Sequence, residues 1–371
     1  MAHLGYFERV YVRERQWLTP HHYAELLALC QIIPGPASSQ LGFLIGLHRA
    51  GYRGALAAWL GFTLPSALLL FFAAGIAGQW RGHVADSVFH GLKLVAVAVV
   101  AQAVWSMGRR LWRDRFTASI GMLAVAVALF WNEANASMVV LGLGALLGVF
   151  LCRSTAPGSA VGHSVVRRPV AWAAGGAFLI LLLGLPALAW RSPQGPLALA
   201  ETFYRAGALV FGGGHVVLPL LRDALVPGGW LTEDSFLAGY GLAQAVPGPL
   251  FTVAAYLGAV NVHVGPPVLG ACIALIAIFL PGLLLAVASI ALWKEFAAFP
   301  GVRGALAGVN SAVVGVLGAA LYSPVLTTSV HTLADGLVAL IAFALLERWR
   351  VQPIGVALLC VAAALAQGAW T

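Results

Sequence analysis

Long apolar segments, separated by short polar ones, run through almost the whole chain. Most of them reach the roughly 20 residues that a helix needs to cross the hydrocarbon layer of a membrane, and four are shorter. Only helices and closed barrels satisfy their backbone groups in lipid, and the sequence lacks the short alternating strands of a barrel. The pattern therefore predicts an all-α polytopic membrane protein with about 12 transmembrane segments, near residues 23–50, 54–78, 84–106, 118–132, 137–152, 170–190, 198–221, 236–259, 267–293, 304–327, 331–346 and 353–369.

The composition agrees with a location in the lipid bilayer. Hydrophobic residues make up 61% of the chain, charged residues only 9%, and the mean hydropathy is +0.90, whereas about a quarter of the residues in a soluble domain are charged. The net charge of +8 comes from basic residues in short loops, which is the positive-inside pattern and not a nucleic-acid patch. The cysteines are scattered without CxxC spacing, so neither a disulfide framework nor a metal site is indicated.

The loop charges also bear on orientation. If every apolar segment crosses the membrane once, most loop arginines and lysines collect on one face, which would be cytoplasmic. If the Pro-Gly-Pro segments re-enter instead, the grouping changes but a similar bias remains. The number of crossings therefore stays open.

Two copies of one pattern occupy the two halves of the chain. Pro34-Gly35-Pro36 and Pro247-Gly248-Pro249 interrupt apolar segments at equivalent places. The further matches are Trp17-Leu18-Thr19 with Trp230-Leu231-Thr232, Gln31 with Gln244, Pro65 with Pro281, and Lys93 with Asn310. The additional apolar segment at 170–190 lies between the copies, and one extra crossing would turn the second copy upside down. Inverted repeats with broken helices are typical of secondary transporters.

This pattern predicts three parts. The first transporter repeat covers 1–155, a linker with one transmembrane helix covers 156–196, and the second repeat covers 197–371. The second copy begins with the segment 198–221, and the first copy has no partner for it. We therefore expect the first repeat to lack a helix that would lie before Met1.

The broken helices predict an anion site. Proline removes a backbone donor and glycine loosens the chain, so such a break persists in lipid only where it lines a cavity or packs in protein. The half-helix after Pro36 points its free N–H groups back at the break, and Ser38, Ser39 and Gln40 add polar groups in its first turn. The equivalent half-helix after Pro249 has Thr252 near its start. Two such ends that meet near the midplane would bind an anion; the alternative is that each Pro-Gly-Pro only kinks a packed helix.

Other candidate residues are fewer. The glycines of Phe211-Gly212-Gly213-Gly214-His215 would let a ligand or another backbone come close, or serve tight helix packing. Lys93 lies in the middle of an apolar segment, where it could offset an anion's charge, pair with another residue or extend to the interface. His3, Glu25 and His215 are candidates for a coupling proton, while Arg205 has Glu201 four residues before it and predicts an ordinary helix-surface ion pair. Walker, HExxH and GxSxG motifs are lacking, so we expect neither an enzyme nor an ATP-driven pump, and no cofactor or metal.

Several of these motifs carry a family resemblance. CQIIPGPASSQLGFLIGLHRAGYRGALAAWLGFTLPS, FGGGHVVLPLL, QAVPGPLFTVAAYLGA and the initial AHLGYF resemble the chromate ion transporter family in its long, two-domain form. The resemblance implies a carrier in the bacterial inner membrane that exports chromate, is driven by protons or the membrane potential, and confers chromate resistance. Near the N-terminus the family's FGGP-type motif is present only as Ala2-His3 and the residues after it, so the resemblance also implies a truncated N-terminus.

The expected mechanism combines these features. A chromate dianion would lie between the two Pro-Gly-Pro breaks, and rocking of one repeat against the other would expose it to each side in turn. A homodimer is a further expectation. The alternative function is a carrier or channel for sulfate or another small anion. The expected binding residues are Gln31, Gly35, Ser38, Ser39, Gln40, Lys93, Gly213, Gly214, His215, Gln244, Gly248, Thr252 and Asn310.

Overall fold

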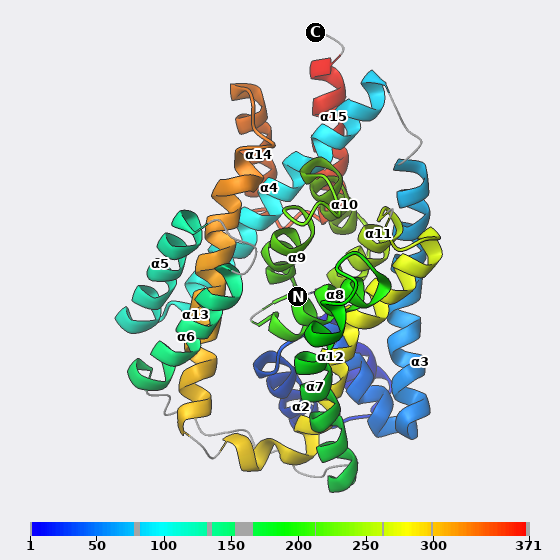
Figure 1. The fold of residues 1–371 in the computed structure, drawn as a ribbon, viewed down its shortest axis with the longest axis vertical. Coiled ribbons are helices and arrows are strands. Elements are labelled where there is room, and N and C mark those ends of the chain that lie inside the picture. Colours follow the sequence, from blue (N-terminus) through cyan, green and yellow to red (C-terminus); the bar gives the residue numbers. More distant parts are fainter. Residues whose placement is uncertain are drawn as a thin grey trace.

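The computed structural model describes residues 2–77, 82–131, 136–152, 166–211, 213–261, 263–297 and 300–368. Within these ranges there is no strand, and each apolar segment predicted from the sequence contains helix (Figure 1). Residues 156–165 of the expected linker and Gly212 of the glycine run lie outside the described residues. Five of the described helices are long and apolar enough to cross a membrane: Ala37–Ala77, His83–Leu111, Arg168–Ala189, Pro267–Leu292 and Gly301–Leu326. The protein is therefore an all-α, multi-pass membrane protein.

The helices follow one another with few residues between them. The first half of the chain contains α1 (Ala2–Phe7), the π-helix η1 (Glu8–Glu14), α2 (Pro20–Ile32), α3 (Ala37–Ala77), α4 (His83–Leu111), α5 (Arg115–Phe130), α6 (Ala136–Leu151) and α7 (Arg168–Ala189). The second half contains α8 (Pro196–Leu209), the 3-10 helix η2 (Gly214–Val216), α9 (Val217–Leu225), α10 (Glu233–Ala245), the 3-10 helix η3 (Leu250–Thr252), α11 (Val253–Ala259), α12 (Pro267–Ala297), α13 (Pro300–Ala320), the π-helix η4 (Leu321–Leu326), α14 (Leu333–Glu347) and α15 (Pro353–Gly368).

The repeated Trp-Leu-Thr sequence produces the same local structure twice. Thr19 caps α2 by accepting a hydrogen bond from the backbone N–H of His22 at 3.2 Å, and Thr232 caps α10 by accepting one from Ser235, also at 3.2 Å. A threonine at this position satisfies one of the unpaired donors of a helix start. Both helices then run for 13 residues and end at a Pro-Gly-Pro break. The sequence repeat is thus matched by a repeat in local structure.

After each break the chain makes a helical hairpin. In the first half, α3 bends at Ala50 and Gly51, and its two arms meet where a methyl group on Gly46 would lie on the carbonyl oxygen of Gly54. In the second half, α11 and α12 meet in the same way, with Gly258 against the carbonyl of Gly270. Close approach of backbones at glycine is a common way for helices to pack in lipid, where apolar side chains gain little from association.

The long helices of the two halves run in opposite directions. Figure 1 shows the long arm of α3 rising on the right, from darker to lighter blue, while α12 descends beside it towards the bottom of the view. The next long helix of each half packs against helices of the other half. The N-terminal-half helix α4 packs against α14 and α15, and the C-terminal-half helix α13 packs against α5 and α6.

The contact between α6 and α13 relies on glycines at four-residue spacing on both helices. A side chain on Gly148 would meet the backbone of Gly304 and Gly308, and one on Gly308 would meet the carbonyl of Gly144. We expect Gly148→Leu to destabilise the protein by about 3 kcal/mol, because the two backbones cannot separate without losing their contact. Gly142→Leu on the exposed side of the same helix, where a Cβ meets nothing within 4 Å, should have little effect. Thermal denaturation of the two purified variants measures the difference; equal stability would show that α6 and α13 do not depend on this contact.

Candidate functional site

Three backbone discontinuities meet inside the bundle. The break after α2 is joined to the end of α8 by a hydrogen bond, in which the N–H of Gly35 donates to the carbonyl of Val210 at 2.8 Å. The segment after Val210 reaches the second break, since a Cβ on Gly214 would lie 3.6 Å from the Cβ of Leu250. The first Pro-Gly-Pro break, the end of α8, η2 and the start of η3 after the second break thus lie next to one another.

A cavity of about 870 Å³ opens beside this region, and we call it the central cavity. Its walls come from the end of α2 and the first break, the C-terminal part of α4, the glycine run, and the turn between α14 and α15. Five of the residues expected from the sequence line it together: Gln31, Gly35, Gly213, Gly214 and His215. Nδ1 of His215 lies 3.1 Å from the hydroxyl of Tyr240, which fixes the orientation of the ring.

Arginines line the same cavity. Arg110 comes from the end of α4 and Arg350 from the α14–α15 turn, together with the carboxylate of Glu347. The amide of Gln102 donates to the carbonyl of Leu346 at 3.1 Å and joins these two elements. In the sequence both arginines look like ordinary loop charges, and no local signal brings them together. They give the cavity a net charge of +1 when Glu347 is ionised, which favours an anion.

The breaks also pack crosswise against the long helices of the other half, next to the proline inside each helix. Gly35 lies against Gly282, which comes directly after Pro281 in α12, and a Cβ on Gly248 would lie on Ser66, which comes directly after Pro65 in α3. The expected pairing of Pro65 with Pro281 therefore corresponds to equivalent places in the structure.

Two of the polar residues expected to face an anion bond to backbone instead. The Gln40 side chain is fully buried and donates from Nε2 to the carbonyls of Pro34 at 2.7 Å and Gly282 at 3.1 Å. The hydroxyl of Thr252 donates to the carbonyl of Pro249 at 2.7 Å. Both side chains satisfy carbonyls that the breaks leave open, so they hold the breaks in shape. The sequence predicted that both side chains would bind the substrate. This prediction is corrected, because both bind backbone carbonyls of the breaks.

Other polar atoms near the breaks remain without a hydrogen-bond partner among the described residues. They include the hydroxyl of Ser39 and Nε2 of Gln244, both donors. Buried polar groups are normally satisfied, so these atoms mark places for water or a ligand. Ser38 is half-buried beside Ser39 at the start of α3.

Lys93 and Asn310 do not line the central cavity. The ammonium of Lys93 forms an ion pair with Asp234 at 2.8 Å, where the aspartate side chain is 76% exposed. The sequence left such a pairing open as one alternative for Lys93. Because Lys93 is paired, the positive charge of an anion site would come from the arginines that line the central cavity. Arg205 is paired with Glu201 at 3.0 Å, as its spacing predicts.

We expect Lys93→Met to leave the KM of transport unchanged. Its ion pair has one strongly exposed member, and such pairs contribute about 1 kcal/mol or less to stability. Asp234→Asn should behave like Lys93→Met, because both remove the same pair. Transport kinetics of the two single variants and the double variant measure this. A large rise of KM in Lys93→Met alone would return the lysine to the binding site.

The three candidates for a coupling proton lie in different surroundings. His3 packs edge-on against the ring of Phe62, with the ring centres 5.2 Å apart. Glu25 is close to His21 at 3.6 Å and His22 at 3.3 Å in the first turns of α2. Of the three, His215 is the one that faces the central cavity.

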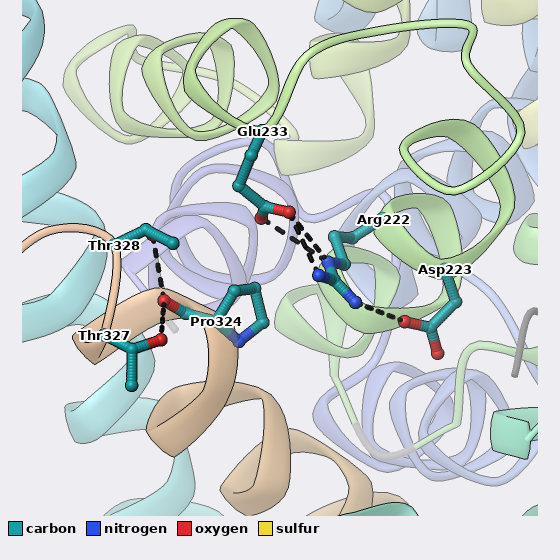
Figure 2. A network of polar contacts seen from close by, with 6 residues as sticks. All are labelled: Arg222, Asp223, Glu233, Pro324, Thr327 and Thr328. Carbon is teal, nitrogen blue, oxygen red and sulfur yellow. Dashed lines mark hydrogen bonds and ion pairs between the residues drawn. The ribbon is translucent and has the colours of Figure 1, made fainter. Parts of the chain in front are cut away.

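A polar network that sequence reasoning missed holds the segment after the glycine run (Figure 2). Arg222 of α9 donates to both oxygens of Glu233, at 3.1 and 3.0 Å to Oε2 and at 3.4 Å to Oε1, and lies 3.5 Å from Asp223. Asp223 in turn accepts a hydrogen bond from Ser137 of α6 at 2.6 Å. The network ties α9 to the start of α10 and to the other half of the chain, and so fixes one end of the glycine segment. Beside it, Thr327 and Thr328 donate to the carbonyl of Pro324, where η4 departs from helical geometry.

A comparison of the sequence with the profiles of known families shows which family the chain belongs to. Residues 1–149 and 197–367 match the sequence profile of the chromate transporter family. This chain belongs to the chromate transporter family. The resemblance inferred from the motifs is thereby confirmed, and the family is one of transporters.

Individual relatives span nearly all of the chain. A probable chromate transport protein of Synechococcus elongatus is 31% identical over 95% of this chain and 86% of its own length. Chromate transport proteins of Pseudomonas aeruginosa and Cupriavidus metallidurans are 27% and 28% identical, over 99% and 94% of this chain and 87% and 84% of their own lengths. No solved structure matches the chain at a significant level.

Proposed function

We propose that this protein is a secondary transporter that exports chromate and binds it in the central cavity. The observation that carries the proposal is the meeting of the first break, the glycine run, Arg110 and Arg350 around one cavity. Backbone N–H groups at broken helix ends and arginine side chains are the groups that bind oxyanions in proteins. Relatives that span most of this chain are named chromate transport proteins, which supports chromate as the substrate.

Within the cavity we assign the residues as follows. Gln31, Gly213, Gly214 and His215 offer amide, backbone and imidazole groups from its walls. Arg110 and Arg350 supply the positive charge. Ser38, Ser39 and Gln244 do not line the cavity, and we assign them as further donors beside the breaks. Gly35 and Gly248 keep the breaks open by conformations that favour glycine, with φ of 120° and 152°.

The exchange of packing partners between the halves supports two inverted repeats, 1–155 and 197–371, joined by the linker 156–196. Each Pro-Gly-Pro break lies against the residue after an internal helix proline of the other repeat, and α4 and α13 each pack on the last two helices of the other repeat. Such reciprocal contacts are what a two-fold relation between two repeats would produce. We propose that the repeats rock against each other and expose the cavity alternately to each side, across about 12 crossings of the bacterial inner membrane.

The driving force we propose is a proton gradient or the membrane potential. Among the candidates His3, Glu25 and His215, the last has the best position, because it lines the cavity and touches Tyr240. Export of chromate by this route would confer chromate resistance. A homodimer is part of the same proposal.

Chromate resistance of cells that lack their own exporter tests this function. We expect cells that express the native chain to grow at chromate concentrations that stop the control cells, and to accumulate less labelled chromate. Cells that express the chain at a good level, yet neither resist chromate nor exclude it, would contradict export. Equal resistance after collapse of the proton gradient would leave the membrane potential as the driving force.

A further inference from the structure

A second large cavity, a long apolar groove of about 760 Å³, lies on the face of α4 that points away from the central cavity. Helix α4 contributes Ala101, Val104, Trp105, Gly108 and Arg109 to its wall, and α14 contributes residues such as Leu340. The central cavity uses the other face of α4, around Ser106 and Arg110. One helix therefore separates the two cavities.

The groove is apolar along its length and cationic at one end. Its single charged lining residue in the described part of the chain is Arg109, whose guanidinium lies over the ring of Trp105, 5.8 Å from the ring centre. No carboxylate within the described ranges pairs with Arg109. Trp112 lines the same end, and Arg113 comes directly after it, exposed, with its Nε donating to the carbonyl of Arg110.

We propose that this groove binds an anionic phospholipid, with one acyl chain along α4 and the head-group phosphate on Arg109. The apolar wall fits a hydrocarbon chain, and the arginine at its end fits a phosphate, so the groove complements both parts of this ligand. Tryptophans at the charged end are the side chains that membrane proteins place at head-group level. Anionic lipids are favoured over zwitterionic ones because the ammonium group of the latter offsets the attraction.

The groove has a consequence for the neighbouring cavity. Arg109 and Arg110 are consecutive residues of α4, about 100° apart around the helix axis, and one lines the groove while the other lines the central cavity. A lipid held by Arg109 fixes the end of α4 against α14 and thereby fixes the position of Arg110. Lipid binding itself does not depend on which anion the protein carries.

Native mass spectrometry of the full-length protein in mild detergent tests the proposal. The delipidated protein is given equal amounts of dioleoyl phosphatidylglycerol and dioleoyl phosphatidylcholine, and the ratio of the two bound lipids is read for each variant. We expect the native protein to retain phosphatidylglycerol in roughly fivefold preference, which is the factor that one arginine near a membrane surface provides. In Arg109→Gln this preference should fall to about one.

Two further variants separate the groove from a general charge effect. Arg53→Gln removes another exposed arginine, in α3, and should keep the preference. Ala101→Phe fills the groove, leaves Arg109 in place, and should reduce the amount of phosphatidylglycerol bound. Each ratio is measured within one sample, so differences in yield between variants do not affect it.

Several results would overturn the proposal. They are equal binding of both lipids by the native protein, an unchanged ratio in Arg109→Gln, and unchanged binding in Ala101→Phe. A dimer mass that disappears in Ala101→Phe would assign the groove to a second copy of the chain. Failure of chromate transport alone would leave the lipid result standing, because the readout is binding.

Discussion

Replacement of Gly35 by alanine is expected to abolish transport. The residue has a φ of 120°, which a residue with a Cβ rarely adopts, and a Cβ there would meet the side chain of Gln40 and the backbone of Gly282. The backbone strain alone costs about 1–3 kcal/mol. The neighbouring backbone of α12 cannot move away without disturbing the contact between the halves. Uptake of labelled chromate by membrane vesicles, normalised to the amount of protein, measures the loss.

Two comparisons make this prediction specific. Gly61→Ala in α3, where a Cβ meets nothing within 4 Å, should preserve transport and stabilise the helix by up to about 1 kcal/mol. Gly248→Ala should also impair transport, because the φ of 152° favours glycine and a Cβ there would meet the side chain of Ser66. A second change, Ser66→Gly, removes the second of these obstacles and should restore part of the activity. Equal activity of Gly35→Ala and Gly61→Ala would show that the first break needs no special conformation.

The second large effect concerns the charge of the central cavity. We expect Arg350→Gln to raise the KM for chromate about tenfold, the factor that corresponds to about 1.4 kcal/mol. Arg350 lines the cavity, and no carboxylate in the described part of the chain forms an ion pair with it. Removal of one positive charge weakens the attraction of a dianion, and the difference should shrink at high salt because salt screens exposed charges. Initial rates of chromate uptake into proteoliposomes measure it.

Neighbouring residues provide the controls. Arg348 lies two positions away, is exposed and does not line the cavity, so Arg348→Gln should leave KM unchanged. Glu347 does line it, and Glu347→Gln should lower KM by removing a repulsive charge. If all three variants behaved alike, the effect would be one of surface charge and the cavity would not be the binding site.

The sequence alone predicted the features that depend on local chemistry. The Trp-Leu-Thr repeat predicted that two places in the chain are equivalent, and these are the starts of α2 and α10, where a threonine N-cap acts through its own backbone neighbours. Pro-Gly-Pro predicted the breaks for the same reason, and Glu201 with Arg205 predicted an ion pair within one helix turn. The family was confirmed because its motifs are themselves local.

Features that depend on distant contacts could not be predicted in this way. Gln40 looked like an anion ligand, but its amide reaches Gly282 in the other half of the chain. Lys93 looked like a counter-charge, and its partner Asp234 became visible only with the packing of α10 on α4. Arg350 reads as a loop residue until the α14–α15 turn is placed beside the end of α4. In each case the deciding partner is more than 100 residues away in the chain.

Uptake of labelled chromate into everted membrane vesicles, with and without excess sulfate, tests the proposed function most directly. In everted vesicles an exporter carries its substrate inwards. We expect saturable, gradient-dependent uptake by the native protein that persists in the presence of sulfate and is lost in Gly35→Ala. Uptake that sulfate abolishes would show a carrier that does not distinguish the two anions, and sulfate uptake without chromate uptake by a well-expressed protein would contradict chromate as the substrate.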